Sequence, residues 1–83
     1  MTFSSRAEKD FDKLRKDKAL LKRAQVLLDL IEVNPFEKNP PYGHLKGRLS
    51  GFYSRRINIQ HRLVYKVVGE EILVISMWSH YEF

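Results

Sequence analysis

The chain has 83 residues, of which 43% are hydrophobic and none is cysteine, and its formal net charge is +5 with a pI near 9.7. A chain of this length forms one domain, residues 1–83, with a thin core. Without cysteine it has neither a disulfide framework nor a thiolate zinc site. The longest uncharged run, residues 72–81, is too short to span a membrane, and no apolar segment near Met1 has the form of a signal peptide. We therefore expect a small, cytoplasmic protein that does not bind membranes.

The first part of the chain has the spacing of two helices. Ser5 and Glu8 fit a capping box, which predicts Ser5 as the N-cap at the start of the first helix. Asp17 is the expected cap of the second helix, and Asn34–Pro35 ends it because a residue before proline avoids the helical region. Each helix has one apolar stripe: Ala7, Phe11 and Leu14 in the first, and Leu20, Ala24, Leu27, Leu28 and Ile31 in the second. We expect an antiparallel pair.

After a loop at residues 35–43, apolar residues alternate along three segments. In residues 53–59, 63–67 and 73–77 they fall largely on odd numbers, which predicts three strands in an antiparallel meander. Residues 2–3 form another strand or none, because the segment is too short to assign. The predicted fold class is α+β, with two N-terminal helices packed on a small antiparallel β-sheet.

The alternation also predicts which side chains lie on the face away from the helices. A three-residue loop at 69–71 would place Arg62 opposite Trp78, with His80 and Arg56 nearby, whereas a two-residue loop would break this register. Positive charge follows the same region, because residues 39–69 contain six Lys or Arg and no acid. Such a stretch suits a polyanion such as nucleic acid, or else a solubilising face that a protein partner neutralises.

The side chains in this region suit RNA cleavage without a metal. His44, His61 and His80 have no zinc-ligand spacing, so we expect neither a metal nor a cofactor. In RNA the 2′-hydroxyl can attack the adjacent phosphate if a base removes its proton, cations stabilise the anion and an acid protonates the leaving oxygen. Arginine suits the second role and histidine the others.

Three of these residues also have a structural interpretation. Arg55 has odd parity, which favours a structural role or a position at the sheet edge. His61 falls in the expected turn between strands, where it would be solvated. Trp78 would be either a platform for a nucleobase or a hydrophobic contact for a protein partner.

Three segments resemble one known family. They are L-K-G-R-L-S-G-F-Y-S-R-R-I at residues 45–57, H-R-L-V-Y at 61–65 and H-Y at 80–81, and they closely resemble the Txe/YoeB family of bacterial type II toxins. The resemblance implies a RelE-like fold and a ribosome-dependent endoribonuclease that cuts mRNA in the A site of the 70S ribosome. It also implies an acidic antitoxin that neutralises the toxin by covering residues 46–66, and homodimers in some members. The complex with the antitoxin is expected to bind operator DNA and repress its own operon.

The resemblance also assigns roles to residues. Lys46, Arg56 and Arg62 match the basic residues that hold the scissile phosphate, His80 matches the general acid, and Tyr81 matches a tyrosine that orients RNA. Further contacts to RNA are expected from the remaining basic and aromatic side chains of the region, which are Arg48, Arg55, Lys66 and Trp78.

Gly43 departs from the family pattern, which places a glutamate there as general base. Three explanations are open: His44 has taken over as base, the chain is a naturally weakened member, or the residue was changed to tolerate a toxic gene. Loss of a general base costs about 10² to 10⁴ in rate, so we expect reduced cleavage. The alternative function is a catalytically impaired module that binds RNA or the ribosome and acts mainly with its antitoxin as a corepressor.

Overall fold

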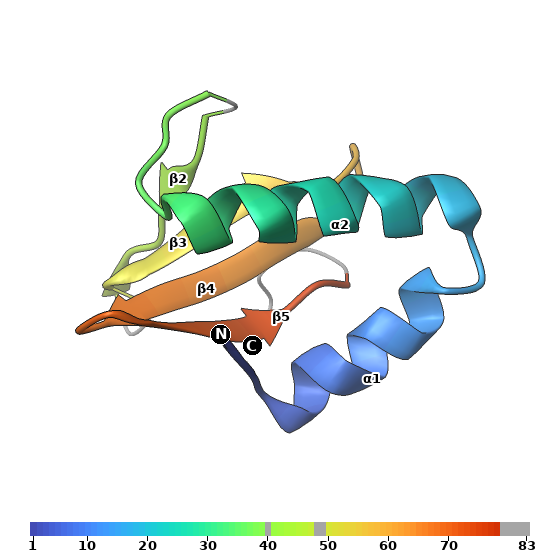
Figure 1. Cartoon of the computed structure of the whole chain (residues 1–83), viewed down its shortest axis with the longest axis horizontal. Coiled ribbons are helices and arrows are strands. Elements are labelled where there is room, and N and C mark those ends of the chain that lie inside the picture. The colour runs from blue at the N-terminus through green and yellow to red at the C-terminus, as the bar shows by residue number, and fades with distance from the viewer. Residues whose placement is uncertain (40, 48–49, 79–83) are drawn as a thin grey trace.

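The computed structural model describes residues 1–39, 41–47 and 50–78, and these residues form two helices and five strands (Figure 1). In chain order the elements are β1 (Thr2–Phe3), α1 (Ser5–Leu14), α2 (Lys18–Val33), β2 (Gly43–His44), β3 (Phe52–Arg56), β4 (Arg62–Val68) and β5 (Glu71–Ser76). The α+β class that the sequence predicts is confirmed.

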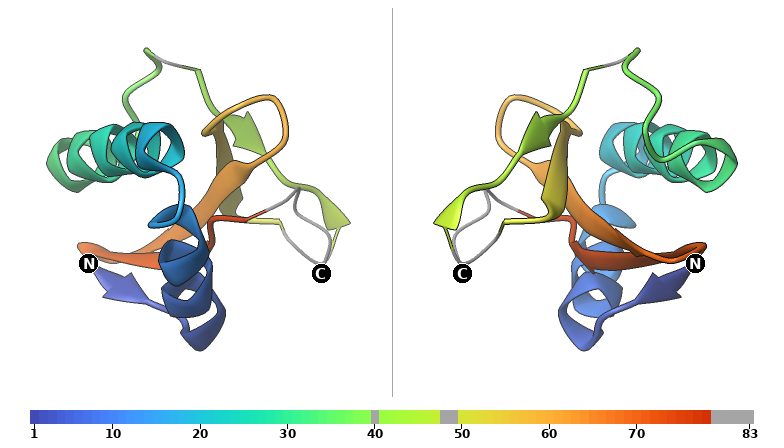
Figure 2. Two further views of the ribbon diagram at one scale, coloured as in Figure 1. Left: turned by 90° about the vertical axis from the view of Figure 1, so that its right-hand side faces the viewer. Right: turned by 90° about the vertical axis from the view of Figure 1, so that its left-hand side faces the viewer.

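The strands form one mixed sheet in the order β1-β5-β4-β3-β2. The meander β3–β4–β5 is antiparallel, as the alternation of apolar residues predicts. Two short strands extend it: β2 pairs with β3, and β1 lies parallel to β5. The sheet is therefore mixed, whereas the sequence predicts a wholly antiparallel one. Two-residue strands are too short to show a period of two, which is why the sequence does not reveal them. Figure 2 shows the twist of the sheet, with α2 in cross-section beside it.

Both helices direct their predicted apolar stripes into one core. From α1 the core takes Ala7 and Leu14, with Phe11 half-buried, and from α2 it takes Ala24, Leu27, Leu28 and Ile31, with Leu20 half-buried. The sheet contributes Leu63, Tyr65, Ile72 and Val74. The expected antiparallel helices run in opposite directions from their connection at Asp17 but splay apart (Figure 1).

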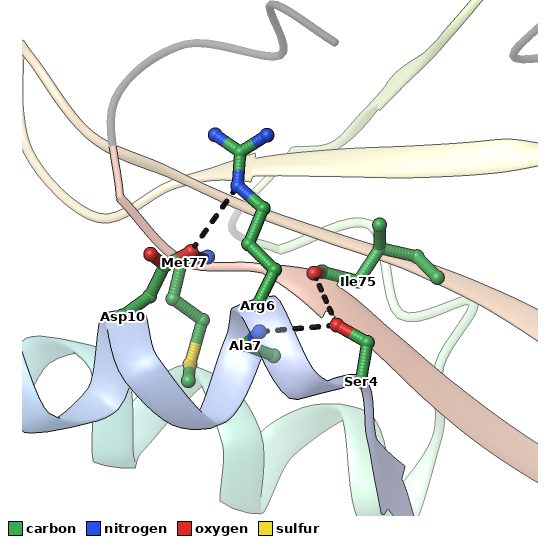
Figure 3. A network of polar contacts seen from close by, with 6 residues as sticks. All are labelled: Ser4, Arg6, Ala7, Asp10, Ile75 and Met77. Atoms are coloured by element: carbon green, nitrogen blue, oxygen red, sulfur yellow. Dashed lines mark hydrogen bonds and ion pairs between the residues drawn. The ribbon is translucent and has the colours of Figure 1, made fainter.

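The first helix is capped by Ser4, one residue before the expected Ser5. The Ser4 Oγ accepts a hydrogen bond from the Ala7 amide (3.0 Å) and donates one to the carbonyl oxygen of Ile75 (2.6 Å), as Figure 3 shows. The Ser4 amide also donates to the carbonyl oxygen of Val74. The contact with β5 thus fixes Ser4 as the N-cap, and the predicted Ser5–Glu8 capping box is wrong. The cap at Asp17 and the end at Asn34 are confirmed.

The loop between β4 and β5 has two residues rather than the expected three. Val68 pairs with Glu71 across a turn in which Gly69 has a φ of +62°, a conformation that favours glycine. The shorter turn moves the register by one position, so Ile72 and Val74 join the core instead of facing away. A bulge between Val64 and Tyr65 then restores the expected register, and Val64 pairs with Ser76.

Within the described part of the chain, neither helix is long and apolar enough to cross a membrane.

Candidate functional site

A hollow of about 690 Å³ lies where the end of β3 and the start of β4 meet the start of β2 and one side of α2. Three arginines from three different elements contribute to its walls, and none of the described residues that line it is acidic. The lining residues are Arg23, Pro41, Tyr42, Gly43, Arg56, Ile57, Asn58, Ile59 and Arg62. This arrangement gives the hollow a strongly positive potential that suits a phosphate group.

Arg56 and Arg62 lie directly opposite each other in the β3–β4 ladder, and both line the hollow. Arg62 is half-buried, and its Nε donates a hydrogen bond to the Ser54 Oγ while one terminal nitrogen reaches the Ser54 carbonyl oxygen (3.4 Å). Arg56 is exposed. The site therefore combines one guanidinium held in a fixed orientation with one that can adapt to its ligand. The predicted proximity of these two residues is confirmed.

Gly43 pairs with Ser54, so its Cα hydrogens point to the face of the sheet that carries Ser54. A Cβ atom built on Gly43 meets no atom within 4 Å, and its φ is not positive. The position therefore has space for a side chain directed into the hollow, and glycine is not required there by the backbone.

His44 is placed on the other face of the sheet. It pairs with Tyr53, and its ring lies 4.9 Å from the ring of Tyr53 and 5.4 Å from that of Tyr42. Because neighbouring residues of a strand point to opposite faces, His44 is directed away from Arg62 and does not line the hollow. The placement argues against the hypothesis that His44 replaces the missing base.

Arg55 is fully buried and has a structural role, as its parity suggests. Its Nε donates to the Tyr65 hydroxyl (3.0 Å), and one terminal nitrogen donates to the carbonyl oxygens of Pro35 (3.2 Å) and Glu37 (2.6 Å). The guanidinium also lies 4.9 Å from the ring centroid of Tyr42. Arg55 thus ties the segment before β2 to the sheet, and it is not available to bind RNA in this structure.

Tyr65 completes this buried group. Its hydroxyl accepts from Arg55 and donates to the Pro35 carbonyl oxygen at 2.6 Å. Burial raises the pKa of the Tyr65 hydroxyl above its usual value, although the neighbouring Arg55 works against this shift. The phenol therefore keeps its proton and its hydrogen bond to Pro35 well into the alkaline range.

Trp78 and His61 form a stacked pair rather than exposed groups. Their ring centroids are 4.0 Å apart, and Lys13 of α1 lies 5.6 Å from the indole. His61 is only 3% exposed, so the prediction that it is solvated is wrong. The expected pairing of Arg62 with Trp78 is absent from the described ladder because β5 ends at Ser76, where the Met77 amide donates to the buried Asp10 of α1 (Figure 3). Trp78 instead packs against the core.

The remaining candidates lie outside the hollow or outside the described residues. Lys46 is exposed after β2, and Lys66 lies 5.2 Å from the ring of Phe52; neither lines the hollow. Arg48, His80 and Tyr81 belong to the part of the chain that is not described. Conversely, no pattern in the sequence distinguishes Arg23, because its neighbours in α2 are an ordinary mixture of charges.

Residues 3–81 match the family of YoeB-like toxins of bacterial type II toxin–antitoxin systems. The chain belongs to this family. This YoeB-like toxin is 46% identical over 66 residues to Toxin YoeB of Synechocystis sp., an alignment that covers 80% of the chain and 77% of the relative.

Solved structures agree with this assignment. The YoeB-like toxin superposes on a YoeB–YefM complex from Staphylococcus aureus with a TM-score of 0.85 and 39% identity, covering 96% of this chain and 94% of that one. It also matches a YoeB dimer from the same organism with a TM-score of 0.83 and 40% identity, at the same coverage. The Txe/YoeB resemblance of the sequence is thereby confirmed, and the chain is a toxin of a type II toxin–antitoxin system.

Proposed function

We propose that this toxin is an endoribonuclease that cuts mRNA in the ribosomal A site by attack of the 2′-hydroxyl on the adjacent phosphate. The observation that carries the proposal is the hollow beside which Arg56 and Arg62 are partners on neighbouring strands, with no acid among its described lining residues. Cations in fixed positions stabilise the negative charge that develops on the phosphate, and they need no reorganisation when the reaction occurs.

The two arginines divide this task. Arg62, oriented by Ser54, contacts one phosphate oxygen, and Arg56 closes on the phosphate from β3. His80 protonates the leaving 5′-oxygen, and Tyr81 orients the RNA, as the family resemblance implies. Lys46, which is exposed after β2, adds a further positive charge for the RNA. Arg48 and Lys66 bind the RNA backbone beyond the scissile phosphate.

Cleavage is slow because none of the described residues that line the hollow supplies a carboxylate or an imidazole as general base. Gly43 has no side chain, and His44 lies on the opposite face of the sheet, so neither can accept the proton of the 2′-hydroxyl. The same observation supports the second candidate function, in which the toxin binds RNA or the ribosome without cutting and acts mainly as a corepressor.

The partners follow from the family. An acidic antitoxin neutralises the toxin by covering the basic region at residues 46–66, and the pair binds operator DNA. The YoeB–YefM complex and the YoeB dimer from Staphylococcus aureus support such an antitoxin partner and a homodimer for this chain. We place the toxin in the cytoplasm, where the ribosome is its target.

Toeprinting on stalled 70S ribosomes tests this function. The wild-type toxin should produce a weak A-site cut, which Arg62→Ala and His80→Ala abolish. Arg15→Ala serves as the control, because Arg15 is an exposed arginine at the end of α1, outside the hollow. Translation arrest without cut mRNA in the wild type would reject the endoribonuclease and favour the binding module.

A further inference from the structure

A second hollow adjoins the candidate site and shares three residues with it. It has a volume of about 510 Å³, and Arg23, Arg56 and Ile57 line both hollows. Its other walls come from one side of α2, namely Ala19, Lys22, Val26 and Leu27. The two hollows therefore adjoin at these three residues, one extending toward Gly43 and the other along the first half of α2.

The second hollow has an apolar floor and a positive rim. Ala19, Lys22, Arg23 and Val26 follow the spacing of one helix face, so they lie side by side toward the end of β3. Val26 is 56% exposed although it is hydrophobic, and Ile57 and Leu27 close the floor. Arg23 and Arg56 are exposed, and neither forms an ion pair with a described acidic residue.

From this arrangement we propose that the second hollow is a subsite for the nucleotide next to the scissile phosphate. Arg23 of α2 holds the flanking phosphate, Arg56 lies between this phosphate and the scissile one, and Lys22 adds to the positive rim. The ribose and base lie on the aliphatic surface of Val26, Leu27 and Ile57. The inference rests on the proposed function, because the flanking nucleotide is defined by its position next to the scissile phosphate in the first hollow.

Charge and size favour a nucleotide over other ligands. The rim carries three cations and, among the described residues, no lining acid, so an anion is the complementary group. The volume falls within the usual range for a small-ligand pocket, about 300–1,000 Å³. An acidic protein segment would meet the same cations, and the experiment separates the two.

The test uses RNA that cannot be cleaved. Short oligonucleotides with 2′-O-methyl groups are compared with versions extended by two nucleotides at the 5′ or the 3′ end, and their binding to the purified toxin is measured by fluorescence anisotropy. One of the two extensions, 5′ or 3′, should raise the affinity of the wild-type toxin for the oligonucleotide. Arg23→Gln should reduce that gain in affinity by about tenfold. It should also remove about one phosphate contact, which changes the slope of log affinity against log salt concentration by about 0.7.

Two further variants sharpen the result. Lys18→Gln is the matched control, because Lys18 is an exposed cation of α2 that lines neither hollow, and it should leave the gain unchanged. Val26→Glu places a carboxylate on the exposed floor and should also weaken the extended oligonucleotide. Gln and Glu are good helix formers, so both variants should fold.

Several outcomes would overturn the subsite. If Arg23→Gln lowers the affinity for the short and the extended oligonucleotides equally, the substitution has only a general charge effect. If it lowers neither affinity, Arg23 does not bind the flanking phosphate. Preferential loss of binding to an acidic peptide of the same charge would assign the hollow to a protein. An Arg23-dependent gain in a toxin that never cuts mRNA on the ribosome would support the subsite and reject the endoribonuclease.

Discussion

Arg56 and Arg62 are Cα partners at the end of the β3–β4 ladder, so two positive side chains lie opposite each other beside one hollow. Like charges directly opposite in an antiparallel pair are destabilising. Arg62 is held by Ser54, whereas Arg56 is exposed and has no acidic partner among the described residues. A bound phosphate would lie between both groups and remove the repulsion. The pair thus lowers the stability of the free toxin and at the same time forms a site that binds an anion.

This relationship predicts opposite effects on stability and activity. Arg56→Gln should stabilise the free protein by about 0.5 kcal/mol, because it removes the repulsion without creating a cavity. The same change should lower mRNA cleavage by about 10², since one of the phosphate-binding cations is lost. Urea unfolding and A-site cleavage measure the two effects. A destabilised variant with full cleavage would contradict both expectations.

Gly43 offers a test by gain of function. Gly43→Glu should raise the cleavage rate by about 10² or more, because the carboxylate enters open space beside Arg62 and can accept a proton. Gly43→Gln is the matched control, having the same shape without the base, and it should not raise the rate. Single-turnover cleavage on stalled ribosomes gives the comparison. Equal rates for the two variants would show that a missing base does not limit the wild type.

Arg55 and its neighbour Arg56 should respond differently to the same substitution. Arg55→Met should cost about 2–4 kcal/mol of stability, because the carbonyl oxygen of Glu37 and the Tyr65 hydroxyl each lose a buried partner. Arg56→Met should cost little, since that side chain is exposed. Denaturant unfolding of both variants checks this contrast. Similar losses would mean that Arg55 does not anchor the segment before β2.

Asp10 should hold the chain beyond β5 in place. Its carboxylate is buried, accepts from the Met77 amide at 2.9 Å and lies 3.8 Å from Arg6 (Figure 3). Asp10→Ala leaves that amide without its acceptor and should cost about 1–3 kcal/mol. Asp10→Asn keeps an acceptor oxygen and should cost less. Hydrogen exchange of the Met77 amide should be faster in Asp10→Ala than in Asp10→Asn, and identical rates would refute this role.

Glu71 should make stability depend on pH in the acid range. Hydrogen bonds from Thr2 (2.7 Å) and the N-terminal amine lower its pKa below 4.5 in the folded state. The stabilisation is therefore complete above the pKa of the unfolded chain and is lost as pH falls through the lower folded pKa. The difference in unfolding midpoint between wild type and Glu71→Gln should shrink between pH 6 and pH 3. A constant difference would show that the Glu71 charge does not hold β1 on β5.

Much of the fold follows from local patterns in the sequence. The stripes of α1 and α2, the cap at Asp17 and the meander β3–β5 are set by the spacing of apolar residues and by short-range hydrogen bonds. The predicted N-cap at Ser5 failed because a long-range contact, from Ser4 to Ile75, fixes where the helix begins. The two-residue turn at Gly69 likewise moved Ile72 and Val74 into the core.

For the site, residue identity and the period of a strand are enough to predict the basic region and the proximity of Arg56 and Arg62, and the family resemblance adds that Gly43 stands where a carboxylate is expected. The burial of Arg55 and the position of His44 on the opposite face of the sheet become visible only in the folded chain. Folding also brings Arg23 of α2 beside the arginines of the sheet. These contacts join residues that are far apart in the chain. They form only when α2 packs on the sheet, and no local pattern in the sequence encodes that packing.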